Sequence, residues 1–258
     1  MEDEKRYAVL IDAENVSNKY GKLIMDEIST YGVATYKRLY GDYTTPSVKA
    51  WIESLKEFAI TPVFQCNYTQ GKSASDTALI IDAMDILYSE NVNGFCLVTS
   101  DSDFTKLAMR LRESGMSVIG MGEQKTPNSL VAACEEFKFL DLLYNEETQR
   151  TTAEQKKKSG GGKDALQSTE TVNNIPSKKE IEKVVVSIIN SLADDDGWVN
   201  ISEIGTGLRK RVPGFDPRNY KCEKLKQLIA GFKSIEVKTE PNAHHRILTI
   251  VYARVKDK

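Results

Sequence analysis

The sequence predicts an α/β protein: a three-layer, mostly parallel, Rossmann-like sheet, followed by a second, small winged-helix domain. Three observations predict it. Short apolar runs alternate with helix-like segments over residues 1–144. A polar stretch rich in lysine and glycine follows over 145–172, which predicts a flexible linker. Residues 173–258 then combine helix-like and strand-like segments. Alternating strands and helices are typical of a parallel sheet that helices cover on both faces.

Six short apolar runs are the predicted strands of the first domain, at 7–11, 33–40, 60–66, 94–100, 117–121 and 138–143. The first and fourth runs are continuous rather than alternating, as expected of strands buried on both faces. Between the runs, segments 46–58 and 103–113 carry apolar residues on one helical face. Segment 75–89 is apolar nearly all round, which predicts a helix that is buried on every side.

The second domain is predicted from the order of its segments, which are helices at 175–196, 201–212 and 216–232 and strands at 234–240 and 245–253. Pro217 stands at the start of the third helix, where proline is favoured. A short strand at 198–200 precedes the second helix. Three helices and a β-hairpin are the pattern of a winged helix.

The distribution of charge and the use of cysteine limit the classes of function that this sequence can have. Residues 1–150 carry 15 Lys/Arg and 23 Asp/Glu, whereas residues 151–258 carry 20 and 14, so an acidic half precedes a basic half. This asymmetry predicts two domains with different tasks. The four cysteines form no C-x-x-C pair, and there is no signal pattern or membrane-spanning apolar run. We therefore expect a reduced, cytoplasmic protein that does not enter a membrane.

Acidic residues follow three of the predicted strands. Asp12 ends the first strand, Asp101 and Asp103 follow the fourth, and the third leads through a loop to Asp76. The carboxyl ends of parallel strands meet at one edge of the sheet, where ligands bind. Carboxylates gathered there repel one another unless a cation joins them. Magnesium or manganese suits such oxygen donors and leaves coordination sites for phosphate.

Each acid also has a structural interpretation. Asp103 and Asp76 are placed to stabilise helix N-termini, with Ser100 and Ser73 three residues earlier as in a capping box. Asp82, in the middle of an apolar helix, is assigned either to support of the metal site or to a structural polar contact. Ser100, next to Asp101, is a further candidate for support of the metal site. Asp85 is expected to face solvent or to form a bridging contact.

Three other types of site fit this sequence poorly. The GKS of 71–73 suggests a P-loop, but Cys66 stands where its first glycine is needed. Lys72 could still meet a phosphate as a point charge. DSDFT at 101–105 fits the D-x-D-x-[TV] motif of haloacid-dehalogenase-like phosphatases, without the acidic motif expected downstream. Histidine chemistry is excluded from residues 1–150, because both histidines, His244 and His245, lie later.

Three blocks closely resemble the NYN domain family, a branch of the PIN-like nucleases: VLIDAENVS (9–17), KSASDTALIIDAMDIL (72–87) and LVTSDSDFTKLAMRLRESGMSVIGMG (97–122). The resemblance implies a PIN-like fold and a metal-dependent ribonuclease. It implies that Asp12, Asp76, Asp101 and Asp103 are the metal ligands and that Asn15 orients water or substrate. For Asp82, the resemblance implies a less certain role.

Residues from about 173 to 254 resemble the OST-HTH (LOTUS) winged helix, on WVNISEIGTGLRKRVPGFDPRNYKCEKLKQLI. This resemblance implies RNA binding. Basic residues are the candidate RNA contacts: Arg209, Lys210, Arg211, Arg218, Lys221, Lys224 and Lys226. A merely solvated polar face is the alternative, and a protein partner docking on this domain is another. Tyr220 is either a base-stacking residue or part of the core.

The sequence thus predicts a metal-dependent endoribonuclease with a tethered RNA-binding winged helix. The rival from another class is a non-catalytic RNA-binding or regulatory adaptor that uses the same cleft. A small-molecule phosphatase using the D-x-D-x-T motif is the third possibility.

Overall fold

The structure, a computed structural model, describes residues 4–65, 74–148, 175–193, 196–241 and 249–256. The chain divides into two compact units, Met1–Val172 and Asn173–Lys258. Three positions discussed above, Cys66, Lys72 and Ser73, and both histidines lie outside the described residues. Among the described residues, no helix is long and apolar enough to cross a membrane.

The first unit is built on a six-stranded sheet in the order β3-β2-β1-β4-β5-β6, with every neighbouring pair parallel. Its strands are β1 (Arg6–Asp12), β2 (Val33–Gly41), β3 (Thr61–Phe64), β4 (Gly94–Val98), β5 (Ser117–Gly122) and β6 (Glu136–Phe139). The predicted α/β class with a parallel sheet is confirmed. β1 pairs with β4, which brings the ends of these two strands together.

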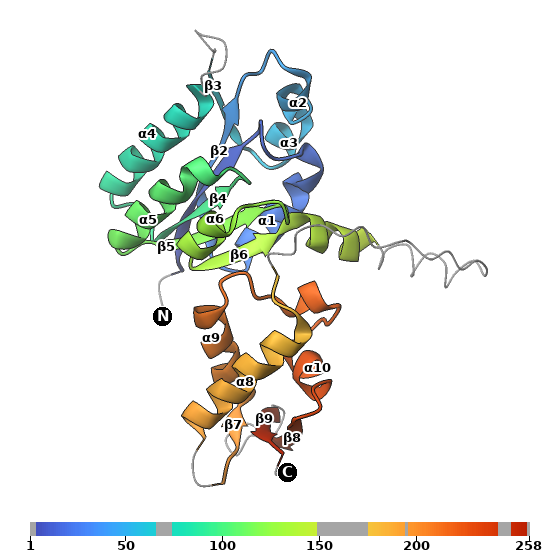
Figure 1. Cartoon of the computed structure of the whole chain (residues 1–258). Helices are drawn as coiled ribbons and strands as arrows, with labels where there is room; N and C mark the ends of the chain where they lie inside the picture. The colour runs from blue at the N-terminus through green and yellow to red at the C-terminus, as the bar shows by residue number, and fades with distance from the viewer. Residues whose placement is uncertain (1–3, 66–73, 149–174, 194–195, 242–248, 257–258) are drawn as a thin grey trace, which may run out of the picture. The chain divides into compact units, whose positions relative to one another are not determined.

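Helices connect consecutive strands: α1 (Gly21–Ser29), α2 (Pro46–Lys49), α3 (Ile52–Glu57), α4 (Ala74–Tyr88), α5 (Thr105–Glu113) and α6 (Asn128–Ala133). Right-handed crossovers put the helices before and after the order reversal on opposite faces. Figure 1 shows α4, α5 and α6 on one face of the sheet, and α1, α2 and α3 on the other. The sheet is therefore the middle of three layers.

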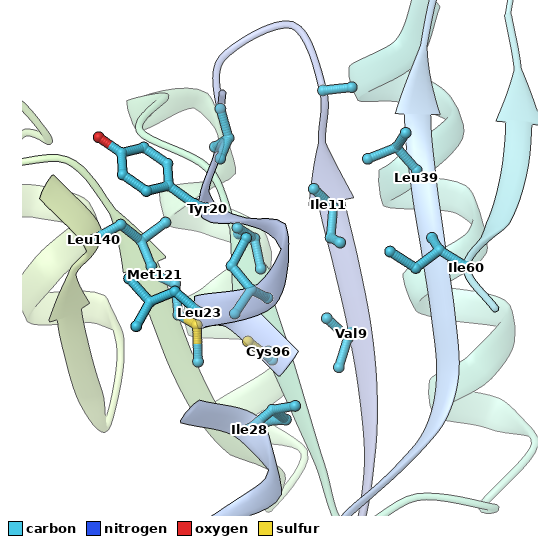
Figure 2. Close-up of a cluster of buried hydrophobic side chains, with 14 of the residues drawn as sticks. Val9, Ile11, Tyr20, Leu23, Ile28, Leu39, Ile60, Cys96, Met121 and Leu140 are labelled. Atoms are coloured by element: carbon cyan, nitrogen blue, oxygen red, sulfur yellow. The ribbon is translucent and has the colours of Figure 1, made fainter. Parts of the chain in front are cut away.

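One large core cluster fills the space between the sheet and α1. Val9 and Ile11 of β1 point into it and meet Leu23 and Ile28 of α1 (Figure 2). The β1 run is buried at every position after Arg6, as predicted for a central strand. Trp51 is fully buried on the same face, and its Nε1 donates to the Val16 carbonyl oxygen at 3.2 Å. This bond ties the loop after β1 to the core.

Two predictions about the first unit are wrong. The strand expected at 138–143 ends at Phe139, and residues 140–148 are helical, so this helix crosses the predicted domain boundary at 144. The helix expected to be buried on every side, α4, exposes Ile81 at 57% and Tyr88 at 71%. Only one face of α4 packs on the sheet, since a helix in an outer layer keeps a solvent side.

The second unit contains α8 (Lys178–Leu192), β7 (Val199–Asn200), α9 (Ile201–Arg211), α10 (Leu225–Ala230), β8 (Ile235–Pro241) and β9 (Thr249–Val255). Its antiparallel sheet has the order β7-β9-β8. Ser177 and Glu180 form a complete capping box at the start of α8. The three helices pack on one face of the small sheet around their own core, in the arrangement predicted for a winged helix.

The third helix of this unit was predicted to be continuous over 216–232, but the structure divides it into two short elements. A 3₁₀ turn over Pro217–Tyr220 is followed by Lys221 in the left-handed region (φ 61°), and α10 begins only at Leu225. Left-handed backbone ends a helix, and Lys221 therefore separates two short elements. Tyr220 is a core residue: it is 6% exposed, and its hydroxyl donates to the Pro176 carbonyl oxygen at 2.8 Å.

Candidate functional site at the carboxyl edge of the sheet

The strand order reverses between β1 and β4, and this is where open α/β sheets bind ligands. The chain leaves β1 for α1 on one face of the sheet and leaves β4 for α5 on the other, so the loops that follow the two strands diverge at this edge (Figure 1). Asp12 is the last residue of β1, and Asp101 follows β4 by three residues. The topology thus places two of the predicted metal ligands at the reversal.

Thr99 joins these two acids. Its hydroxyl donates to Asp12 Oδ2 at 2.8 Å and accepts the Asp101 backbone N–H at 3.1 Å. The backbone N–H of Thr99 donates to the Met121 carbonyl oxygen of β5, which fixes Thr99 itself. Sequence reasoning missed this residue. Its position beside Asp101, directly after an apolar strand, is the signal that could have found it.

The Asp12 carboxylate is 1% exposed and accepts four hydrogen bonds. Oδ1 accepts the backbone N–H groups of Glu14 and Asn15 at 3.1 and 3.2 Å, which closes the turn after β1. Oδ2 accepts Asn15 Nδ2 at 2.8 Å, besides the Thr99 hydroxyl. Burial raises the pKa of Asp12 above its ordinary value, and the four donors oppose this effect.

Asp101 and Asp103 form a small capping unit. Asp101 is the N-cap of the 3₁₀ turn that leads into α5, and its Oδ1 accepts the Asp103 backbone N–H at 2.9 Å. Asp101 is half-buried and Asp103 is exposed. The capping interpretation therefore applies to Asp101. Ser100, expected as the cap, instead accepts the Glu123 backbone N–H at 2.9 Å and holds the end of β5 beside β4.

Asp76 lies in the first turn of α4, next to Ser75, whose hydroxyl donates to Glu14 Oε2 at 3.2 Å. The other carboxylate oxygen of Glu14 accepts the Asp42 backbone N–H at 3.1 Å. Asp42 follows β2 directly, just as Asp12 ends β1. Glu14 and Asp42 had no predicted role, and an acid immediately after a strand was the available signal for Asp42.

Asp82 is tied to β2. Its carboxylate forms an ion pair with Arg38 and accepts the hydroxyl of Tyr40, which is fully buried. Arg38 and Tyr40 both belong to β2, and neither is an acid of the site. These contacts favour the structural interpretation of Asp82, because a carboxylate that is 18% exposed needs partners to stay buried.

We expect Asp82→Ala to lower the free energy of unfolding by about 1–3 kcal/mol, because the buried Tyr40 hydroxyl loses its acceptor and Arg38 its partner. Urea denaturation measures this. Asp85→Ala, on the exposed side of the same helix, is the matched control and should change stability little. A variant that unfolds like the wild type would remove the structural assignment.

Asp12 and Asp101 are linked through Thr99, but the predicted metal ligands do not form a ready coordination shell. Among the residues that the structure describes, no group of three or more His, Cys, Asp or Glu side chains is placed to hold a metal ion. Asp12 and Asp101 instead accept nearby N–H and hydroxyl groups. The chemistry of these acids still fits a hard cation, since carboxylate oxygens are the ligands that Mg²⁺ prefers. Asn15 and Thr99 are side-chain donors that can turn away without moving the backbone.

The basic residues predicted to contact RNA in the second unit differ in how exposed they are and in whether they already form an ion pair. Arg209, Lys210 and Arg211 occupy the last turn of α9 and are exposed, as are Lys221, Lys224 and Lys226. Arg218 is engaged: its Nε and Nη2 bind the Asp216 carboxylate at 3.0 and 2.8 Å. A fork-to-fork pair of this kind occupies the guanidinium. Arg218 therefore positions the turn after α9 and contributes less free charge than predicted.

Comparisons with known proteins agree with this organisation. The model of the NYN domain matches residues 6–142, and that of the OST-HTH/LOTUS domain matches residues 176–247. A curated relative, the uncharacterized protein MJ0482 of Methanocaldococcus jannaschii, is 27% identical over 126 residues. That match covers 47% of this chain and 49% of the relative, so the chain spans about half of that protein's length.

Among solved structures, a protein of unknown function from Vibrio parahaemolyticus, VPA0982, matches with 17% identity and a TM-score of 0.46. The match covers 53% of this chain and 93% of that one. The resemblance seen in the sequence is confirmed by the two domain matches, of which the first alone spans more than half of the chain. The chain belongs to the NYN domain family and carries an OST-HTH/LOTUS domain after its NYN domain.

Proposed function

We propose that this protein is a metal-dependent endoribonuclease whose NYN domain cleaves RNA that its OST-HTH/LOTUS domain helps to hold. The NYN domain is nuclease-like and the OST-HTH/LOTUS domain is of an RNA-binding kind, which supports a nuclease with an RNA-binding domain in general. The observation that carries the finer proposal is the junction of Asp12 and Asp101 through Thr99 at the strand-order reversal.

Asp12, Asp76, Asp101 and Asp103 would hold Mg²⁺ or Mn²⁺ at this edge. Such an ion supplies an activated water and offsets negative charge on the phosphate. Burial disfavours the ionised form of the Asp12 carboxylate. A cation bound beside Asp12 would stabilise that ionised form. Asn15 holds the Asp12 carboxylate in place through both its side chain and its backbone. Lys72 remains a proposed phosphate contact.

The two domains divide the work in this proposal: residues 1–144 as the catalytic domain, 173–258 as the RNA-binding domain and 145–172 as the tether. The acidic half repels RNA in the absence of metal, whereas the exposed cations of α9 attract its phosphates. Tethering then raises the concentration of RNA at the cleavage site. The three free cysteines of the described chain suit a reducing, cytoplasmic setting.

The proposed activity is tested with the purified full chain and a labelled pool of single-stranded RNA. We expect internal cleavage in Mg²⁺ or Mn²⁺ and none in EDTA. RNA binding without cleavage in either metal would favour the adaptor instead. Hydrolysis of small phosphate monoesters with intact RNA would favour the phosphatase.

RNA affinity should fall steeply as salt rises, because each phosphate that a lysine or arginine neutralises releases counterions. We expect Lys210→Gln to reduce the slope of the logarithm of RNA affinity against the logarithm of salt concentration by about 1. The same change should weaken binding equally for all RNA sequences. Lys56→Gln on α3 is the control, since Lys56 pairs with Glu53 on the acidic domain. An unchanged salt slope in the Lys210 variant would point to a protein partner for this surface.

The composition of the segment between the domains predicts where proteases act first. It contains almost no large apolar residues and carries a lysine run, so we expect limited trypsin digestion to cut within about 148–172 before either domain is degraded. Mass spectrometry of early fragments checks this. Early cuts inside either domain, with 148–172 intact, would contradict the proposed tether.

A further inference from the structure

Glu14 contacts three elements of the candidate site at once. Its backbone N–H donates to Asp12 Oδ1 at 3.1 Å. Its side-chain Oε1 accepts the Asp42 backbone N–H at 3.1 Å, and Oε2 accepts the Ser75 hydroxyl at 3.2 Å. One residue thus links the end of β1, the end of β2 and the first turn of α4. Both of its carboxylate oxygens are engaged.

The contact with Ser75 is the informative one. Ser75 is 2% exposed, and a buried hydroxyl needs a partner. Ser75 directly precedes Asp76, so whatever fixes Ser75 also fixes the backbone that carries Asp76. Glu14 itself is exposed, and its carboxylate reaches inward from the loop after β1. This loop is the one that Asp12 closes through its own hydrogen bonds.

α4 is also tied to the sheet at Asp82, which binds Arg38 and Tyr40 of β2. Asp82 lies six residues beyond Asp76, more than one and a half helical turns away. The Glu14–Ser75 hydrogen bond ties the other end of α4, where Asp76 lies, to the loop after β1.

We propose that Glu14 is a positioning residue that sets the separation of the Asp12 and Asp76 carboxylates for a divalent cation. This inference rests on the proposed function, because it presumes that these acids bind metal. Mg²⁺ demands nearly ideal octahedral geometry, whereas Ca²⁺ accepts irregular shells. Loss of the Glu14–Ser75 bond therefore weakens Mg²⁺ binding more than Ca²⁺ binding. A purely structural role of Glu14 would not change the preference between the two ions.

The test uses the full chain and calorimetric titration with Mg²⁺ and with Ca²⁺, without RNA. Glu14→Ala and Ser75→Ala should each raise the Kd for Mg²⁺ by about 10-fold, within the range for residues that orient metal ligands. Both should raise the Kd for Ca²⁺ by clearly less. The double variant should bind like Glu14→Ala, because that single change already removes the Glu14–Ser75 hydrogen bond. Glu14→Gln, which keeps one carbonyl oxygen, should lie between Ala and wild type.

Glu57→Ala, an exposed glutamate at the end of α3, is the matched control and should bind both ions like the wild type. Melting temperatures without metal show whether the variants fold. Wild-type Mg²⁺ affinity in Glu14→Ala, effects that add fully in the double variant, or equal losses for Mg²⁺ and Ca²⁺ would each overturn the positioning role alone. A wild-type chain that binds neither ion would overturn the positioning role and the proposed metal site together.

Discussion

Asp101→Asn should lower metal-dependent RNA cleavage by about 100-fold or more while leaving the fold intact. The reason lies in the two tasks of Asp101. As an N-cap it accepts the Asp103 N–H, and asparagine caps helices as well as aspartate does. As a metal ligand it supplies a negative charge that asparagine lacks. The substitution therefore separates the charge of the side chain from its structural contact.

Single-turnover cleavage of a labelled RNA measures the loss of activity, and a thermal melt without metal measures whether the fold is intact. The melting temperature should hold or rise, because repulsion among the carboxylates falls. Asp85→Asn removes the same charge from the exposed face of α4 and should cleave like the wild type. Wild-type cleavage by the Asp101 variant would eliminate Asp101 from the site. A collapse in melting temperature would instead reveal a structural role beyond capping.

Asp12→Ala should abolish cleavage and also destabilise the protein. Four donors lose their acceptor: two backbone N–H groups, the Asn15 amide and the Thr99 hydroxyl. Relief from burying a charge offsets part of this loss, and we expect the free energy of unfolding to fall by about 1–3 kcal/mol.

Asp12→Asn is the comparison for this prediction. Its carbonyl oxygen can still accept the two backbone N–H groups, so its stability should lie closer to that of the wild type while cleavage remains lost. Urea denaturation of the two variants gives the difference. Equal destabilisation by Ala and Asn would show that the hydrogen bonds to Oδ1 contribute little. Substantial cleavage by either variant would contradict the assignment of Asp12.

The sequence predicted the parallel sheet well because its central strands are continuous apolar runs with no competing interpretation. Hydrophobic periodicity did not predict which side of a helix faces solvent. The apolar residues of α4 give no sign that Ile81 and Tyr88 face water, because the sequence does not state which layer a helix occupies. The end of β6 was missed for a related reason, since Leu140 and Leu143 are buried whether the chain is extended or helical.

Only those site residues that follow a central strand could be predicted from the sequence. Asp12 and Asp101 could be placed at one edge because each directly follows a run that must be a central strand. Thr99 was missed although it directly follows an apolar strand, because the sequence does not show that its hydroxyl points to Asp12. The partners of Asp82 were equally hidden, since Arg38 and Tyr40 are distant in sequence and meet it only across the sheet.

Direct titration of Mn²⁺ into the full chain tests most directly whether a divalent cation binds among the carboxylates at the β1–β4 edge. Calorimetry should detect binding to the wild type and to Asp85→Asn with the same Kd, and a Kd at least about 10-fold higher for Asp101→Asn. The same ranking should hold for the Mn²⁺ concentration that gives half-maximal RNA cleavage. Equal Mn²⁺ affinity in all three proteins, or RNA cleavage that proceeds unchanged in EDTA, would contradict the proposed metal site.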